Sequence, residues 1–109
     1  MDDRTNSSPP DASAEPLTFL VERYWPDIDE PAARRLAASL GEAARRMADE
    51  GVVIEHLGSI LMPRDQVVFS LIKATDEASA RQLTARAEAP ADRIAMAIRL
   101  WEGDRCTDT

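Results

Sequence analysis

The stretch EHLGSILMPRDQVVFSLIKA, residues 55–74, most constrains what this chain can fold into. It consists of two apolar runs joined by a short polar segment, residues 63–66, whose Pro and Asp favour a tight turn. We therefore expect two antiparallel strands, residues 52–62 and 66–74, that form a hairpin. Each run is apolar on both of its faces, so helices packed against one face leave a second apolar face uncovered.

The segment before the hairpin predicts a strand followed by a helix. Residues 17–24 are rich in β-branched and aromatic side chains and predict the strand, which Pro26 ends because proline cannot donate to a ladder. The helix is expected to begin after Asp29, a good N-cap, and to stop at Gly51. Its apolar stripe, at helical spacing, consists of Leu36, Leu40, Ala43, Ala44 and Met47.

The segment after the hairpin completes the predicted fold. A second helix is expected from the cap Asp76 to about Ala87, and a last strand at residues 92–101. The order is therefore β-α-β-β-α-β, the arrangement of ferredoxin-like folds. Right-handed crossovers place both helices on one side of a four-stranded antiparallel sheet, which predicts an α+β class.

The folded domain is expected to span residues 17–102. Residues 1–16 are rich in Asp, Ser, Pro and Ala, with Met1 as the single bulky apolar side chain, so we expect a disordered tail. Residues 103–109 are expected to form a short flexible tail.

The turn predicts the register of the hairpin and therefore the composition of its two faces. With Met62 opposite Val67, one face carries His56, Gly58, Ile60, Met62, Val67, Phe69, Leu71 and Lys73. The opposite face carries Leu57, Ser59, Leu61, Val68, Ser70 and Ile72. The sequence leaves open which face meets the helices, but either choice exposes at least four large apolar side chains. Because a monomer rarely shows such a patch, we expect a homodimer that joins through the helix-free faces.

The charge and composition limit the partners. The chain has 20 acidic and 13 basic residues and a net charge of −7, so we expect neither nucleic-acid nor membrane-surface binding. No apolar run approaches the roughly 20 residues that span a bilayer, and the start lacks the pattern of a secretory signal. The single cysteine, Cys106, cannot form an internal disulfide, which fits a cytoplasmic location.

Two side chains stand out as candidates for a site. His56 is the only histidine, and with Glu22 or Glu55 it could begin a metal or acid–base site; the simpler interpretation is a histidine at the rim of the sheet. Glu22 lies in an otherwise apolar strand, where a buried charge needs a partner. We expect Arg99 on the last strand to pair with it, either as a structural ion pair or beside a ligand pocket.

The remaining candidates lie near strand ends or on the hairpin. Tyr24, Trp25 and Trp101 either line the mouth of a pocket or seal the core. Ser70 has neither a Gly-x-Ser-x-Gly context nor a positioned histidine, so a serine nucleophile is not expected there. The predicted ligand-binding residues are therefore Glu22, Tyr24, His56, Ser70 and Arg99, with no catalytic residue assigned.

The runs FLVERYWPDID, EHLGSILMPRDQVVFSLIKA and RAEAPADRI together resemble a family of small bacterial ferredoxin-like domains of unknown function. One branch of that family is described as nickel-binding. The resemblance covers residues 19–100 and implies a dimeric βαββαβ domain related in shape to dimeric α/β-barrel proteins. Relatives carry His at the position of Gly58, Cys at Ser70 and another His near Leu83. This chain therefore lacks much of the nitrogen and sulfur that nickel prefers as ligands. Nickel is implied by the resemblance alone, with His56 as the candidate metal ligand.

Three functions stay open at this point. We favour a dimeric protein that binds a small ligand or a metal ion between its sheets. The alternative is a small cofactor-free enzyme of the dimeric α/β-barrel type, such as an oxygenase or isomerase. The third is a structural or regulatory partner module. A cavity lined by His56, Glu22 and Tyr24 would support either of the first two, and a dry interface would support the third.

Overall fold

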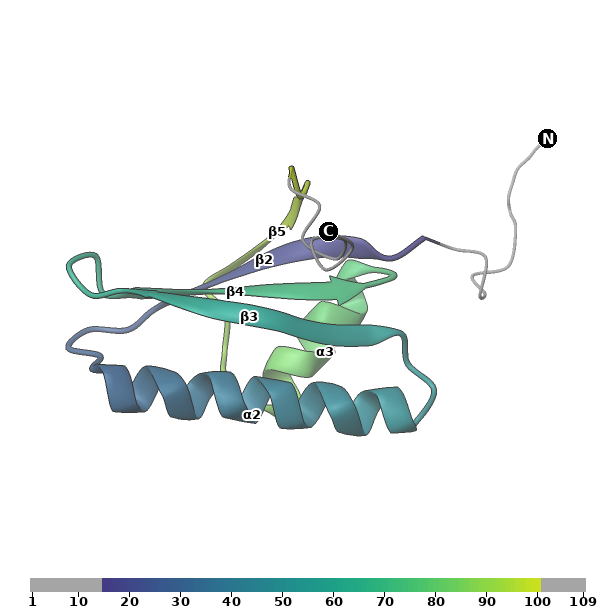
Figure 1. The fold of residues 1–109 in the computed structure, drawn as a ribbon, viewed down its shortest axis with the longest axis horizontal. Helices are drawn as coiled ribbons and strands as arrows, with labels where there is room; N and C mark the ends of the chain where they lie inside the picture. Colours follow the sequence, from purple (N-terminus) through teal and green to yellow (C-terminus); the bar gives the residue numbers. More distant parts are fainter. Residues whose placement is uncertain (1–14, 101–109) are drawn as a thin grey trace, which may run out of the picture.

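The structure, a computed structural model, describes residues 15–100, which form a four-stranded sheet with two helices against one face (Figure 1). The elements are β2 (Leu17–Tyr24), α2 (Glu30–Asp49), β3 (Ile54–Met62), β4 (Val67–Ala74), α3 (Glu77–Arg86) and β5 (Arg93–Ala97). The antiparallel strands lie in the order β3-β4-β2-β5, which confirms the ferredoxin-like α+β fold. Both predicted tails lie outside the described residues except for residues 15 and 16, and so do Trp101 and Cys106.

Helix α2 forms where the capping pattern predicts it. The Asp29 carboxylate accepts a hydrogen bond of 2.9 Å from the backbone N–H of Ala32, and proline occupies the first turn. The helix ends at Asp49, shortly before Gly51, whose φ of 96° suits glycine. The buried face of the helix contains the whole predicted stripe and one further residue: Ala33, Leu36, Leu40, Ala43, Ala44 and Met47.

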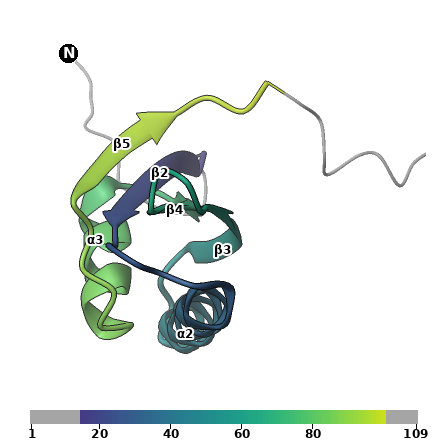
Figure 2. The ribbon, with the colours of Figure 1, turned by 90° about the vertical axis from the view of Figure 1, so that its left-hand side faces the viewer.

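The core lies between the two helices and one face of the sheet (Figure 2). Its sheet side is built from the alternating apolar residues of the central strands, with Val68 and Ile72 of β4 almost fully buried. Leu61 of β3 packs against this core, and Leu83 of α3 is completely enclosed in it. The face that contains Ser59 and Ser70 therefore meets the helices, which settles the choice that the sequence left open.

Strand β5 is shorter than predicted. It pairs with β2 only from Arg93 to Ala97, whereas the alternating pattern predicts a strand to residue 101. The antiparallel register places Thr18 opposite Ala97, and Pro16, two residues earlier, has no N–H to donate. Strand β2 therefore ends before the alternating apolar pattern of the last segment ends.

Neither described helix has the length and apolar character needed to cross a bilayer. The longer one, α2, is amphipathic, with a charged face on the side away from the sheet.

Candidate functional site

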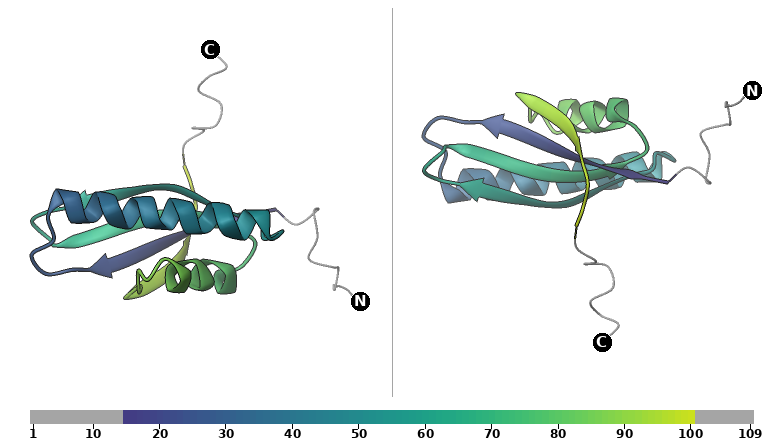
Figure 3. Two further views of the ribbon diagram at one scale, coloured as in Figure 1. Left: turned by 90° about the horizontal axis from the view of Figure 1, so that it is seen from below. Right: turned by 90° about the horizontal axis from the view of Figure 1, so that it is seen from above.

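The helix-free face of the sheet carries an apolar hollow. Figure 3, right, shows this face, with the helices behind the strands. The hollow has a volume of about 360 Å³ and is lined by Leu20, Gly58, Ser59, Ile60, Phe69 and Leu71. These residues come from the three neighbouring strands β3, β4 and β2, so the hollow extends from the edge strand β3 across the face of the sheet.

The hollow exists because one strand position has no side chain. Gly58 has a φ of 155°, a conformation that side chains rarely adopt, and a Cβ added there would meet no atom within 4 Å. Two apolar residues near Gly58 line the hollow. Leu71 lies opposite Gly58 across the ladder, and Ile60 lies two residues further along β3. Glycine inside a strand commonly marks a bulge, and the register here shifts between His56 and Gly58.

This β-bulge corrects the predicted placement of His56. The hairpin register is as predicted from Met62 to Gly58, with Ile60 opposite Phe69. Beyond the bulge, however, His56 lies opposite the buried Ile72, because Leu57 is an extra residue without a partner. His56 therefore shares a face with Ser59 under helix α2, whereas the predicted register placed it on the same face as Gly58.

The bulge brings His56 into a chain of three hydrogen-bonded side chains. Its Nε2 lies 2.9 Å from Ser59 Oγ, and Ser59 Oγ lies 2.7 Å from Ser70 Oγ. Ser70 is only 2% exposed, whereas His56 and Ser59 are half-buried. Burial lowers the pKa of His56 below the usual value of 6.5, because desolvation disfavours the charged imidazolium. The imidazole is therefore neutral at neutral pH.

The structure places the other predicted site residues on the opposite face. Glu22 lies opposite Phe69 on the helix-free side, and Tyr24, at the end of β2, is 65% exposed. His56 and Ser70 are thus brought together through Ser59, but the sheet separates them from Glu22 and Tyr24. No single cavity lined by His56, Glu22 and Tyr24 forms.

Glu22 has a different ion-pair partner from the predicted one. Its carboxylate accepts a hydrogen bond of 2.6 Å from Arg93 Nη1, because the β2–β5 register places these two residues directly opposite each other. Arg99 lies beyond the last paired residue of β5, Ala97, and so cannot reach the same ladder position. The ion pair at the sheet edge is present as expected, with its cation at the other end of the strand.

The aromatic residue after β2 both packs on the core and lines a surface pocket. Trp25 contacts the core cluster, and the guanidinium of Arg23 stacks 4.6 Å from its ring centroid. Trp25 also lines a surface pocket of about 250 Å³, together with Arg23 and Leu36, so it takes part in both of the arrangements expected for it. Within residues 15–100, no three His, Cys, Asp or Glu side chains cluster as metal ligands would.

Sequence reasoning missed Ser59 and the role of Gly58. In a regular strand, residues 56 and 59 point to opposite faces, so the spacing alone gives no reason to pair them. The signal that could have revealed the contact is the glycine between them, because glycine in a strand interior often marks a bulge. The extra residue at the bulge places His56 and Ser59 on the same face.

Comparison with known proteins supports the fold. No family model and no curated protein matches the chain. Among solved structures, the crystal structure of SCO4226 from Streptomyces coelicolor A3(2) is similar, with a TM-score of 0.61. The similarity covers 78% of this chain and 99% of that one, at 13% sequence identity. At this identity the likeness establishes a shared ferredoxin-like fold, and the functional argument must come from the residues of this chain.

Proposed function

We propose that this chain is a homodimeric binding protein of the reducing cytoplasm, which holds a small apolar molecule between the helix-free faces of two sheets. The observation that carries the proposal is the apolar hollow above Gly58 on an uncovered sheet face. A hollow of this kind in a β-sheet needs a cover before it can retain a ligand, and a second sheet provides one.

A second copy of the chain suits this face better than a different partner. The face exposes large apolar side chains, with Ile60 at 56%, and it carries two ion pairs. Glu55 lies 3.5 Å from Lys73 near one end of the face, and Glu22 pairs with Arg93 near the other. Such mixed charge is self-complementary, as a two-fold interface requires, whereas a different partner would favour one sign.

The last described residues fit the same arrangement. After β5 the chain passes over the helix-free side of the sheet instead of packing on it (Figure 2). Ile98 and Leu100 on this arm are 77% and 91% exposed. Apolar side chains on an extended arm favour contact with a partner, and we propose that each arm packs against the second sheet.

The lining of the hollow defines the class of ligand. Leu20, Ile60, Phe69 and Leu71 provide an apolar wall, and the face offers no cluster of metal ligands within residues 15–100. Two hollows that face each other would form a chamber within the roughly 300–1,000 Å³ typical of small-molecule sites. The ligand is therefore a small, uncharged, largely apolar molecule.

Sedimentation velocity tests the dimer. We expect a species of twice 12.0 kDa at micromolar concentration under reducing conditions. Ile60→Asp should give a folded monomer, because the side chain is exposed in the single chain but its charge would be buried without a partner in the dimer. The matched control is Ala38→Asp on the exposed side of α2, which should remain dimeric.

Binding of the uncharged fluorophore N-phenyl-1-naphthylamine tests the chamber. Its fluorescence should rise on mixing with the wild type and the Ala38→Asp variant, and this rise should be lost in Ile60→Asp. A wild-type protein that stays monomeric well above micromolar concentration would contradict the proposal. So would equal fluorophore binding by the monomeric variant, which would place the apolar site elsewhere.

A further inference from the structure

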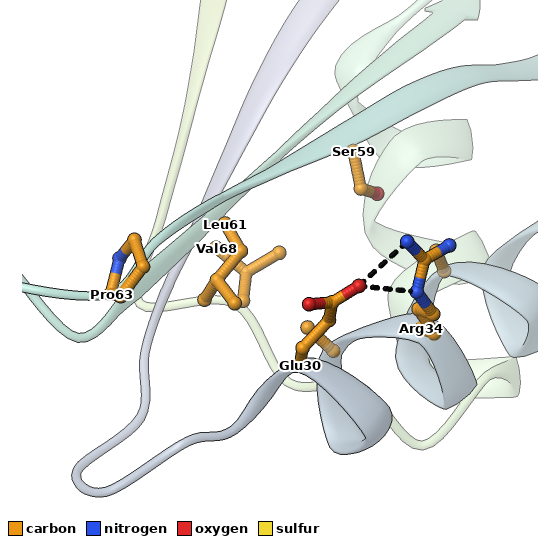
Figure 4. Close-up of a pocket in the computed structure, with 8 residues that line it drawn as sticks. Glu30, Arg34, Ser59, Leu61, Pro63 and Val68 are labelled. Carbon is orange, nitrogen blue, oxygen red and sulfur yellow. Dashed lines mark hydrogen bonds and ion pairs between the residues drawn. The ribbon is translucent and has the colours of Figure 1, made fainter.

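A second cavity lies on the helix side of the sheet, between the start of α2 and the end of the β3–β4 hairpin (Figure 4). It is a crevice of about 390 Å³, within the range of small-molecule sites. One end is apolar, with Leu61, Pro63 and Val68. The other end is polar, with Ser59 and the Glu30–Arg34 ion pair (Figure 4). Figure 4 shows the Ser59 hydroxyl pointing toward the side of the crevice where Arg34 lies.

Ser59 is the residue that joins this crevice to the buried hydrogen-bonded chain. Its side chain lines the crevice, and its Oγ contacts both His56 Nε2 at 2.9 Å and Ser70 Oγ at 2.7 Å. A serine hydroxyl within hydrogen-bond distance of a histidine, in a cavity that admits a small molecule, meets the nucleophile–base requirement of covalent catalysis.

We propose that Ser59 is the nucleophile of an acyl-transfer site, with His56 as its general base and Ser70 as a positioning residue. This activity is independent of the dimer, because the three residues and the crevice belong to one chain and lie on the other side of the sheet. The site would act on small esters whose acyl or leaving group is apolar enough to lie on Leu61, Pro63 and Val68.

The proposed roles require one of the two tautomers of His56 that fit the contact with Ser59. In the tautomer with its proton on Nδ1, the imidazole accepts the Ser59 hydroxyl hydrogen at Nε2. Ser59 has no second hydrogen, so the bond between the two serines is then donated by Ser70. That donated bond holds the Ser59 oxygen in place and favours negative charge on it. Burial keeps the pKa of His56 low, so the base is unprotonated at neutral pH.

The reaction balances without any further cofactor. Ser59 Oγ forms a bond to the ester carbonyl carbon while its proton passes to His56 Nε2. The bond between that carbon and the leaving oxygen then breaks, and the leaving group takes the proton from His56. Water attacks the acyl–serine ester in the same way, giving up a proton to His56, which returns it to Ser59 as the free acid leaves. The Arg34 guanidinium, paired with Glu30 at 2.6 Å, places N–H donors at the polar end of the crevice.

Acetylation of the full-length chain by 4-nitrophenyl acetate tests this proposal. We expect 4-nitrophenolate release and an acetyl group on the peptide that contains Ser59, located by mass spectrometry. His56→Gln should slow acetylation of Ser59 by about a hundredfold or more, the lower end of what a positioned base contributes. Ser59→Ala should remove the labelled site. The exposed serine of α2 provides a matched control, since Ser39→Ala should leave the rate unchanged.

Ser70→Ala should slow acetylation of Ser59 without moving the label to another residue, and Ser70→Thr, which keeps a hydroxyl, should restore part of the rate. A merely structural role for Ser70 would change stability and leave the acetylation rate per folded molecule unchanged.

Two results would overturn the proposal. One is acetylation of Ser59 no faster than that of Ser39 in the same wild-type sample. The other is equal labelling of Ser59 in folded protein and in protein unfolded by concentrated urea, a comparison that needs no variant and so stands even if His56→Gln fails to fold. Lys73, the only lysine of the chain, reports background acetylation in every sample.

Discussion

Replacement of Gly58 by Ala tests the cause of the hollow and of the His56–Ser59 contact. Gly58 has a φ of 155°, and an added Cβ would meet no heavy atom within 4 Å, so the substitution causes no clash. Its effect must therefore come from the backbone. Holding an L-residue in this region requires about 1–3 kcal/mol, and the reduced freedom of the unfolded chain returns up to roughly 1 kcal/mol. We expect a net loss of about 1–2 kcal/mol in the free energy of unfolding.

Gly41→Ala provides a control with the opposite sign. Gly41 lies in the interior of α2, and an added Cβ would lie 3.6 Å from His56 Nδ1, an ordinary van der Waals contact. Alanine in a helix interior is more favourable than glycine by about 0.5–1 kcal/mol. We therefore expect Gly41→Ala to stabilise the protein, so that the same chemical change at two glycines gives opposite results.

Urea unfolding, followed by circular dichroism, measures both variants. Equal slopes of free energy against urea for all three proteins would show that the comparison reports stability and not a change in the surface exposed on unfolding. If Gly58→Ala were as stable as the wild type, the bulge would not depend on glycine. A glycine origin for the hollow and for the His56–Ser59 contact would then be refuted.

Three other predictions concern His56, nickel and the tail. Because the folded-state pKa of His56 is lowered, the unfolded chain takes up the proton first as the pH falls. The free energy of unfolding should therefore be highest well above about pH 6.5 and should decrease as the pH drops through that value. Urea midpoints between about pH 5 and 7 should show this fall in the wild type and a flatter profile in His56→Gln. Calorimetric titration should detect no submicromolar nickel site, because the chain has one His and one Cys; tight stoichiometric binding that survives His56→Ala would contradict this. Deletion of residues 1–16 should change the free energy of unfolding by less than roughly 0.5 kcal/mol, and a larger loss would mean that the tail docks on the domain.

Much of the fold could be predicted from local patterns. The caps Asp29 and Asp76, the apolar stripe of α2 and the turn at residues 63–66 are short-range signals, and each has a direct physical cause in backbone hydrogen bonding or periodicity. The end of β5 depends on a different strand, since Pro16 and the start of β2 limit it. Periodicity within the last strand carries no information about that limit.

The site was harder to predict than the fold, because it depends on a single irregularity. A strict alternation places His56 on the helix-free face, and one extra residue at the bulge reverses this placement. The predicted partner of Glu22 was wrong for a related reason: the choice between Arg93 and Arg99 depends on register across β2 and β5, which no local pattern in either strand determines.

The bulge gives the two faces of the sheet a common origin and makes their proposed functions separable. On one face, the missing side chain of Gly58 opens the hollow. On the other, the same shift of register carries His56 to Ser59. Ile60→Asp should therefore abolish only the dimer and its fluorophore binding, and Ser59→Ala only the acetylation. Because Gly58→Ala acts on the bulge itself, it should weaken both. A variant of Gly58 that lost one property and kept the other would show that the two faces do not share this cause.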